Sequence, residues 1–269
     1  MVVDVGAPVL YNRRLSPHYN VIALAAPAIA AAAEPGQFVM VKPAPGLEPL
    51  LRRPFSVFEV LRDSDGTPTA ITLLNKRVGI TTAQLFDAVE GQRIPCLGPL
   101  GRPFSLVDAS TEAWMVAGGV GLAPFATLAT ALAARGVPIR LFYGGRSADD
   151  LFFIELFESA GAQLVLTTED GSRGEHGRVT APLDRALAGR GARSVALFAC
   201  GPEPMLAAVA RLAAHHSVSC EVSVERVMGC GLGGCYSCVV PLRGNDGHPH
   251  FVRSCVNGPV FDAAALIWD

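Results

Sequence analysis

The sequence has little charge and no marked excess of either sign. Only 17% of the 269 residues are charged, and 22 Lys and Arg against 24 Asp and Glu leave a formal net charge of −2. No basic run interrupts this balance, whereas a nucleic-acid-binding protein needs a positive face to neutralise phosphates. Nucleic acid is therefore not an expected partner.

Long hydrophobic runs are also missing. The longest, residues 21–33, contains Pro27 and is shorter than the roughly 20 apolar residues that a membrane-spanning helix needs. Residues 1–6 show no basic segment leading into an apolar one, as a secretory signal would require. We therefore expect no membrane span, no export and a cytoplasmic location.

The low charge does not indicate disorder, because 50% of the residues are hydrophobic. The chain is longer than a typical domain of about 100–200 residues, which favours more than one compact unit. Runs of β-forming residues at 39–42, 55–60 and 69–74, separated by Gly and Pro, predict an antiparallel barrel over residues 1–101.

After Gly101 the pattern changes to alternating strands and helices. Strands are predicted at 113–117, 139–143, 162–167 and 194–199, and helices at 123–134, 181–188 and 204–215. This alternation is typical of a parallel, Rossmann-like sheet covered on both faces. The predicted fold class is therefore multidomain β plus α/β, with the barrel at 1–101, an α/β domain at 102–216 and a small C-terminal domain at 217–269.

Cysteine is concentrated at the end of the chain, where five of the seven residues fall in the last 50 positions. An odd number in a chain without an export signal argues for metal or cofactor ligation over disulfides. Four follow the spacing C-x4-C-x2-C…C, which is the plant-type [2Fe–2S] pattern. They are Cys230, Cys235, Cys238 and Cys255.

The glycines between the first two of these cysteines support the cluster interpretation. Gly231, Gly233 and Gly234 leave room for backbone N–H groups to approach the sulfurs. The alternative is a structural zinc site, although zinc usually takes paired short knuckles. A Rieske centre would need two His ligands, and His248 and His250 lack that spacing; both are expected on an exposed loop.

Four further segments have the residue types of a flavin and nucleotide site. Residues 53–56 offer a guanidinium for a pyrophosphate, followed by an aromatic and a hydroxyl for a flavin, or else a charged turn before a strand. Residues 78–82 open a short helix whose N–H groups suit a phosphate, or an ordinary capped helix. Residues 118–124 and 200–205 follow strands and precede helices, as dinucleotide turns do, although a plain turn and a buried Cys200 thiol are the alternatives.

Taken in order, these motifs resemble those of the ferredoxin-NADP reductase superfamily. Residues 53–56 are similar to its R-x-[YF]-S flavin motif, residues 118–124 to its G-G-x-G-x-x-P turn, and residues 200–202 to its C-G-P motif. With the C-terminal cysteines, the whole chain resembles the electron-transfer subunits of class 1B dihydroorotate dehydrogenase. This resemblance implies FAD in the barrel, NAD in the α/β domain and [2Fe–2S] in the C-terminal domain.

The resemblance also implies which residues bind each group. FAD is assigned to Arg53, Pro54, Phe55, Ser56, Leu74, Asn75, Lys76, Thr81 and Thr82. NAD is assigned to Gly118, Gly119, Gly121, Cys200 and Gly201, and the cluster to the four cysteines. The family commonly carries Tyr-Arg where this chain has Asn75-Lys76. No catalytic acid or base is expected, because the cofactors carry the redox chemistry.

The implied function is electron transfer within a heterotetramer that contains an FMN-bearing catalytic subunit. Electrons from dihydroorotate would pass from FMN through [2Fe–2S] and FAD to NAD+ in pyrimidine biosynthesis. The alternatives are a reductase with the same cofactors that serves a ferredoxin, sulfide dehydrogenase or hydrogenase partner, and a zinc-stabilised module without redox turnover. NADP preference stays open, because Arg146 favours a 2′-phosphate or pairs with its acidic neighbours, and Asp149 and Asp150 would repel one.

Overall fold

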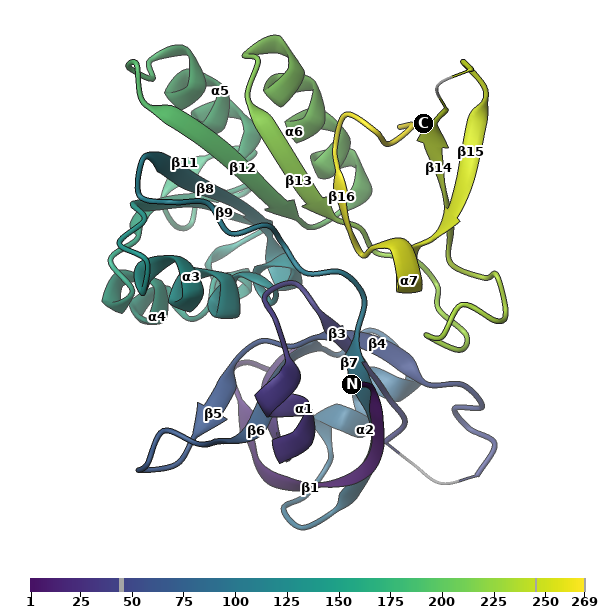
Figure 1. The fold of residues 1–269 in the computed structure, drawn as a ribbon. Helices are drawn as coiled ribbons and strands as arrows, with labels where there is room; N and C mark the ends of the chain where they lie inside the picture. Colours follow the sequence, from purple (N-terminus) through teal and green to yellow (C-terminus); the bar gives the residue numbers. More distant parts are fainter. Residues whose placement is uncertain (44–45, 245, 269) are drawn as a thin grey trace.

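The structure, a computed structural model, describes residues 1–43, 46–244 and 246–268. Figure 1 shows a barrel-like antiparallel sheet, a second sheet between layers of helices, and a C-terminal hairpin beside that second sheet. The predicted fold class, an antiparallel barrel joined to a parallel α/β sheet and a small C-terminal domain, is confirmed.

The barrel-like sheet has seven strands in the order β4-β3-β7-β1-β2-β6-β5. Its strands are β1 (Val3–Arg14), β2 (Tyr19–Ala25), β3 (Phe38–Val41), β4 (Arg53–Ser56), β5 (Val60–Arg62), β6 (Pro68–Lys76) and β7 (Arg93–Leu100). Two short helices accompany it, α1 (Pro27–Ala32) and α2 (Ile80–Phe86). Side chains from alternate positions, such as Ile22 and Leu24 on β2, fill its interior.

The predicted strand at 55–60 is wrong, because the chain changes partners within it. Up to Ser56 the chain pairs with β3, whereas from Val60 it pairs with β6. Between them the backbone N–H of Val57 donates to Gln37 and that of Phe58 donates to Thr72. Residues 57–58 therefore form a corner that carries the chain from one edge of the sheet to the other.

The longest apolar run, residues 21–33, is divided between a strand and a helix. β2 ends at Ala25, and Pro27 opens α1, where its missing N–H costs no hydrogen bond. Within the three described ranges, no helix has the length and hydropathy needed to span a membrane.

The second sheet has the order β11-β10-β9-β8-β12-β13-β16, in which only β16 is antiparallel. Its strands are β8 (Thr111–Gly118), β9 (Ile139–Gly145), β10 (Gln163–Thr168), β11 (Glu175–His176), β12 (Ser194–Cys200), β13 (Ser219–Ser223) and β16 (Val260–Asp262). Its helices are α3 (Phe125–Ala133), α4 (Ile154–Ser159), α5 (Thr180–Ala188) and α6 (Glu203–His215), with 3₁₀ turns at Gly119–Leu122 and Ala148–Asp150.

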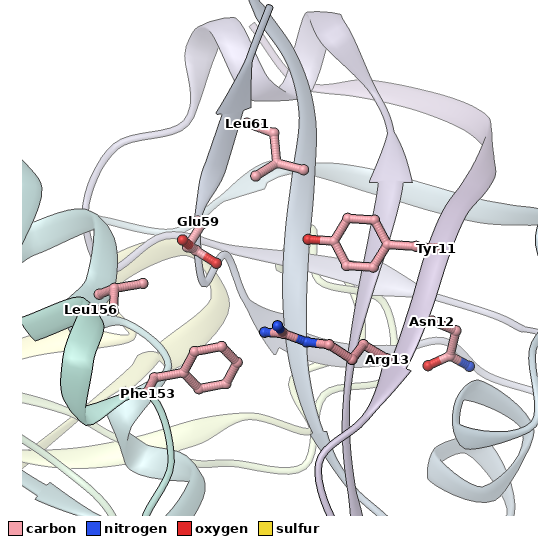
Figure 2. Close-up of a pocket in the computed structure, with 7 residues that line it drawn as sticks. All are labelled: Tyr11, Asn12, Arg13, Glu59, Leu61, Phe153 and Leu156. Carbon is pink, nitrogen blue, oxygen red and sulfur yellow. The ribbon is translucent and has the colours of Figure 1, made fainter.

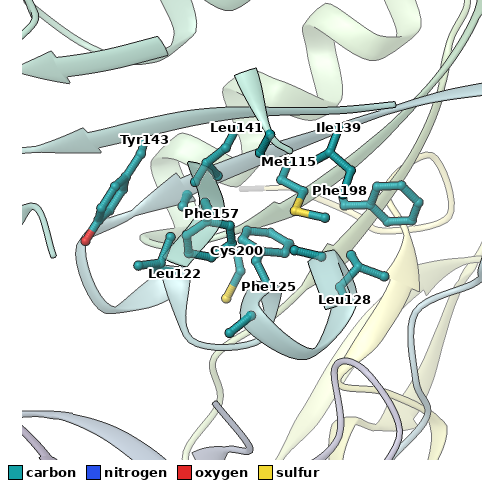
Figure 3. Packing of buried hydrophobic residues seen from close by; sticks show 14 of the residues in the cluster. Met115, Leu122, Phe125, Leu128, Ile139, Leu141, Tyr143, Phe157, Phe198 and Cys200 are labelled. Carbon is teal, nitrogen blue, oxygen red and sulfur yellow. The ribbon is translucent and has the colours of Figure 1, made fainter. Parts of the chain in front are cut away.

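Hydrophobic cores cover both faces of this sheet because its strands alternate. On β8, Met115 contributes to one core, and its neighbours Trp114 and Val116 contribute to the other. Figure 3 shows Met115 among the side chains of β9, α3 and β12 that form the first core, which includes Cys200. The turns at residues 118–124 and 200–205 are therefore flanked by strands and helices whose side chains form these two cores.

The C-terminal segment contributes to two structures. β13 and β16 extend the second sheet past residue 216, whereas β14 (Val239–Arg243), β15 (Pro249–Arg253) and α7 (Ser254–Asn257) form a hairpin followed by a helical turn. His248 lies in the hairpin turn and His250 on β15, so only the former lies on the predicted loop; both are exposed. Residues on both sides of position 216, the predicted domain boundary, therefore contribute strands to the second sheet.

Candidate functional site

The cysteine loop fits its surroundings only with glycine at two positions. Gly231 and Gly233 have φ angles of +74° and +82°, where other residues are strained. A Cβ on Gly231 would lie 2.6 Å from Met40 Cγ, and one on Gly233 would lie 2.8 Å from Val256 Cγ2. The loop is thus held tightly between barrel strand β3 and helix α7.

Each of the four sulfurs has a backbone N–H close by. The N–H of Leu232 donates to Cys230 at 3.3 Å, and that of Cys255 donates to Cys238 at 3.5 Å. The N–H of Ser237 donates to Cys235 and that of Gly233 to Cys255. Because N–H donors stabilise negative charge on sulfur, this donor set fits thiolate ligands of an iron–sulfur cluster.

The four thiols lie as two pairs. Cys235 is within hydrogen-bonding reach of Cys230, and Cys255 of Cys238. Across the described parts of the chain, no three His, Cys, Asp or Glu side chains are grouped to hold one metal ion. Two pairs fit a [2Fe–2S] cluster, in which each iron takes two protein ligands, better than a zinc ion surrounded by four.

The two pairs differ in environment. Cys235 is exposed, and hydrogen bonds from the hydroxyl and N–H of Ser237 lower the pKa of its thiol to about 6. Cys255 is buried, and that burial raises the pKa of its thiol to about 12. The Cys230–Cys235 pair therefore faces outward, whereas the Cys238–Cys255 pair faces the protein.

The inner pair lies against the barrel. Cys238 and Cys255 pack in one hydrophobic cluster with Phe38 and Met40 of β3 and Leu100 of β7. Strand β4, which carries the predicted flavin motif, pairs directly with β3. Neighbouring strands lie about 4.8 Å apart, so the cysteine loop packs against the strand next to the one that carries the flavin motif.

The flavin motif forms the edge strand β4, whose outer side pairs with no other strand among the described residues. The Arg53 side chain is exposed and, among residues 1–43, 46–244 and 246–268, donates only to the carbonyls of Leu51 and Arg52, both at 3.1 Å. Its guanidinium is therefore free to meet a phosphate. Pro54, Phe55 and Ser56 are half-buried, so part of each residue stays accessible to a ligand.

The remaining residues assigned to FAD are tied into the protein. The buried Asn75 donates to Asn20 Oδ1 at 2.7 Å and to the Thr82 carbonyl at 2.9 Å. The Thr82 hydroxyl accepts from the N–H groups of Val78 and Gly79 at the start of α2. Leu74 and Thr81 are buried as well. Contacts from these positions to a flavin would therefore come mainly from the backbone.

A cleft of about 510 Å³ lies at the carboxyl ends of β8, β9 and β10, where open α/β sheets bind nucleotides. Its walls include Gly118, Gly119, Gly144 and Gly145, which let a ligand approach the backbone, and Lys76 from the barrel. The buried Thr167 hydroxyl, which has no hydrogen-bond partner in the described parts of the chain, also lines it. An unpartnered buried donor and a glycine floor fit a dinucleotide.

Three residues assigned to NAD lie beneath this cleft and do not line it. A Cβ on Gly121 would lie 2.2 Å from the Cys200 carbonyl oxygen, so Gly121 is needed for the two turns to pack. Gly201, with a φ of +155°, packs against Gly118 in the same way. Cys200 is buried in the core, and burial raises the pKa of its thiol to about 12. Its environment matches the alternative of a structural thiol.

The acidic neighbours of Arg146 do not pair with its side chain. Among the described residues Arg146 forms no ion pair, and neither does Arg178, which lines the same cleft. Asp150 instead accepts from Lys76 Nζ at 3.2 Å and from the Arg146 backbone N–H at 3.1 Å. Two unpaired guanidinium groups therefore border the cleft, and they suit an anionic nucleotide.

Sequence reasoning missed Tyr19, Thr167 and Arg178. Tyr19 opens β2, a strand that the sequence indicates through the β-forming run at 19–24, and its hydroxyl lies near Gly119 at the cleft. Thr167 is next to last in β10 and is the last residue of the strand predicted at 162–167, so its position at the carboxyl end of a predicted strand was a usable signal. Arg178 lies in an irregular turn, for which the sequence has no comparable signal.

Two family models match the chain. Residues 115–211 match the oxidoreductase NAD-binding domain, and residues 225–267 match the iron–sulfur cluster binding domain of dihydroorotate dehydrogenase B. The matched ranges contain, respectively, the nucleotide cleft turns and the four paired cysteines.

Whole-chain comparisons agree with these matches. The dihydroorotate dehydrogenase B (NAD(+)) electron transfer subunit of Desulforamulus reducens is 34% identical over 98% of both chains. The same subunit of Bacillus caldolyticus is 37% identical over 87% of both chains. Among solved structures, an NADH-dependent reduced ferredoxin-NADP oxidoreductase studied for flavin-based electron bifurcation has a TM-score of 0.85 at 27% identity, over 98% of this chain and 91% of that one. The chain therefore belongs to the family of dihydroorotate dehydrogenase B electron transfer subunits.

Proposed function

We propose that this chain transfers electrons from the FMN of a separate dihydroorotate dehydrogenase subunit to NAD+, through its own [2Fe–2S] cluster and FAD, in pyrimidine biosynthesis. Oxidation of one dihydroorotate to orotate releases two electrons and two protons, and reduction of one NAD+ takes both electrons and one proton. When bound, FAD exchanges a pair of electrons with the nucleotide and single electrons with the cluster.

One contact carries this proposal. The buried pair Cys238 and Cys255 packs against Met40 on β3, and β3 pairs with the flavin-motif strand β4. The nucleotide cleft reaches the same barrel through Lys76. The cysteine loop and the nucleotide cleft thus both border the barrel that is proposed to bind FAD, an arrangement that supports an electron relay.

The protein's own residues bind and orient these groups. Cys230, Cys235, Cys238 and Cys255 would hold the cluster, the Arg53 guanidinium would neutralise the flavin pyrophosphate, and Gly118 and Gly119 would admit the nucleotide to the backbone. The N–H donors around the sulfurs would set the potential of the cluster. No side chain needs to act as a general acid or base.

The partner is proposed to cover the outer cysteine pair in a heterotetramer with two subunits of each kind. Large hydrophobic side chains are exposed on the cysteine loop and on the C-terminal hairpin and helical turn that follow it, and exposed apolar surface of this kind supports a protein interface there. They are Val227, Leu232, Tyr236, Phe251 and Val256. We also propose a cytoplasmic location, because none of the seven cysteines forms a disulfide.

A second candidate keeps the cofactors and changes the partner. The similarity over 91% of an NADH-dependent reduced ferredoxin-NADP oxidoreductase chain favours a ferredoxin-type partner as this alternative. A hydrogenase or sulfide dehydrogenase partner belongs to the same class.

Isolation of intact complexes from native cells tests the proposal. We expect the chain to co-purify with an FMN protein and the preparation to reduce NAD+ when dihydroorotate is added. A different partner, with no dihydroorotate turnover, would overturn the substrate and retain the alternative. A colourless preparation with stoichiometric zinc would overturn both.

A further inference from the structure

One carboxylate joins the barrel to the nucleotide domain. Asp150, in the 3₁₀ turn after β9, accepts hydrogen bonds through Oδ1 from the Tyr19 hydroxyl and from Lys76 Nζ at 3.2 Å. Its other oxygen accepts from the backbone N–H of Arg146. Two donors thus come from barrel strands β2 and β6, and the acceptor comes from the other domain; we call Tyr19, Lys76 and Asp150 the interdomain clasp.

Aromatic contacts support the clasp on either side. The Phe152 ring lies 4.8 Å from the Tyr19 ring, and the Phe153 ring lies 4.6 Å from that of Phe58 in the barrel. Lys76 Nζ also lies 4.8 Å from the centre of the Tyr19 ring. Phe153 has a left-handed φ of 59°, a strained conformation that persists only where surrounding contacts impose it.

The clasp lies where the nucleotide cleft meets the barrel. Lys76 and Asp150 both line the cleft, and the Tyr19 hydroxyl would be 4.0 Å from a Cβ on Gly119, one of the predicted NAD-binding residues. The other side of the same junction is an open hollow of about 550 Å³, where Figure 2 shows Phe153 opposite Glu59. The hydrogen bonds that Tyr19 and Lys76 donate to Asp150 therefore lie on the side of the junction that faces the nucleotide cleft.

We propose that Asp150 is a positioning residue for hydride exchange, which fixes the nicotinamide cleft against the flavin-binding barrel through Tyr19 and Lys76. The inference rests on the proposed function, since it places NAD and FAD on the two sides of the clasp. Hydride moves only between atoms about 3–3.5 Å apart, and a misplacement of about 1 Å can cost a factor of about 100 in rate. The hydrogen bonds of Asp150 to Tyr19 and Lys76 join the barrel to the nucleotide domain beside the cleft. They therefore help to set the distance between the nicotinamide and the flavin.

The test is stopped-flow reduction of the flavin by NADH in the chain loaded with FAD and cluster. We expect Asp150→Asn to lower the limiting rate about 10-fold and Tyr19→Phe to lower it less. NADH binding should not weaken, because Lys76 remains in the cleft. The double variant should be no slower than Asp150→Asn, because both changes break the same bond. Asp149→Asn, in the same turn and with the same loss of charge, is the matched control.

A positioning role lowers the rate and leaves FAD content and iron content unchanged. A rate in Asp150→Asn and Tyr19→Phe equal to that of Asp149→Asn would overturn the clasp, and so would additive losses in the double variant. If Asp150→Asn fails to fold, Tyr19→Phe alone decides by the same comparison. Absence of any NADH-driven flavin reduction in the wild-type chain would instead overturn the proposed function together with the clasp.

Discussion

Met40 of the barrel lies directly against Gly231 of the cysteine loop, so closely that a Cβ on Gly231 would be 2.6 Å from Met40 Cγ. The residues come from strand β3 and from a loop almost 200 positions later in the chain. Their contact holds the buried Cys238 and Cys255 against the strand that neighbours the flavin motif. The shape of the loop is therefore set by the barrel as well as by the four cysteines.

Replacing Gly231 with Ala should displace the loop and weaken the cluster. The left-handed φ alone costs about 1–2 kcal/mol for an L-residue, and the contact with Met40 adds to this. We expect faster loss of the iron–sulfur absorbance under air or chelator. Gly234→Ala is the control, since a Cβ there meets no atom within 4 Å; equal stability of the two variants would contradict the packing argument.

Replacing Arg53 with Ala should weaken FAD binding. A charge-assisted hydrogen bond contributes about 1.5–3 kcal/mol, which corresponds to a factor of about 10–150 in the dissociation constant. Titration of the apo-protein with FAD measures the change. Arg62→Ala, an equally exposed arginine on β5, should bind FAD normally. Unchanged affinity in Arg53→Ala would show that the pyrophosphate lies elsewhere.

Replacing Gly121 with Ala should disrupt the nucleotide cleft without touching its lining. The new Cβ would lie 2.2 Å from the Cys200 carbonyl oxygen and would push the two turns apart. We expect weaker NADH binding, by about 10-fold or more, because main-chain displacement near a site is costly. Binding assays on Gly191→Ala, a loop glycine with free space around it, give the reference. Normal NADH binding in Gly121→Ala would refute this role.

The sequence predicted the order of the domains and cofactor motifs along the chain better than it predicted the contacts between distant residues. The cysteine spacing and the strand–turn–helix positions are local patterns, and the structure places Gly118 and Gly119 at the cleft accordingly. Asn75, in contrast, is engaged by Asn20 and Thr82, partners on other elements that no local pattern reveals. Cys200 shows the same limit, because its position at a strand end left a nucleotide-site residue and a buried thiol as alternatives, and the structure was needed to place it in the core.

The interdomain clasp was not predictable for the same reason. Tyr19 and Asp150 are 131 positions apart, and neither belongs to a motif. The split of the predicted strand 55–60 also depends on distant partners, since residues 57–58 bond to Gln37 and Thr72. Local patterns identified elements and cofactor motifs, whereas pairings between elements required the structure.

Replacing Glu59 with Gln should stabilise the protein at neutral pH. Burial raises the pKa of the Glu59 carboxyl above its ordinary 4.5, despite the opposing effects of Arg13 and Thr72 (Figure 2). The folded state then holds its proton to higher pH than the unfolded state does, so stability falls as pH rises through this interval. We expect a higher unfolding temperature for Glu59→Gln at pH 7 and a smaller gain below pH 4.5.

The control for this change is Glu158→Gln, at an exposed position on α4. Its unfolding temperature should match that of the wild type at both pH values. A gain for Glu59→Gln that does not shrink at low pH would show that packing, and not the carboxyl proton, causes it.

The central claim is that the cluster and the nucleotide site perform separate steps, and Cys235→Ser tests it most directly. The variant should lose iron and sulfide, because one iron loses a thiolate, yet keep NADH-driven flavin reduction, which uses only FAD and the cleft. Cys220→Ala, at a buried cysteine outside the loop, should keep both. In complex with the catalytic subunit, Cys235→Ser should no longer reduce NAD+ with dihydroorotate. Undiminished dihydroorotate-driven NAD+ reduction without the cluster would contradict the account.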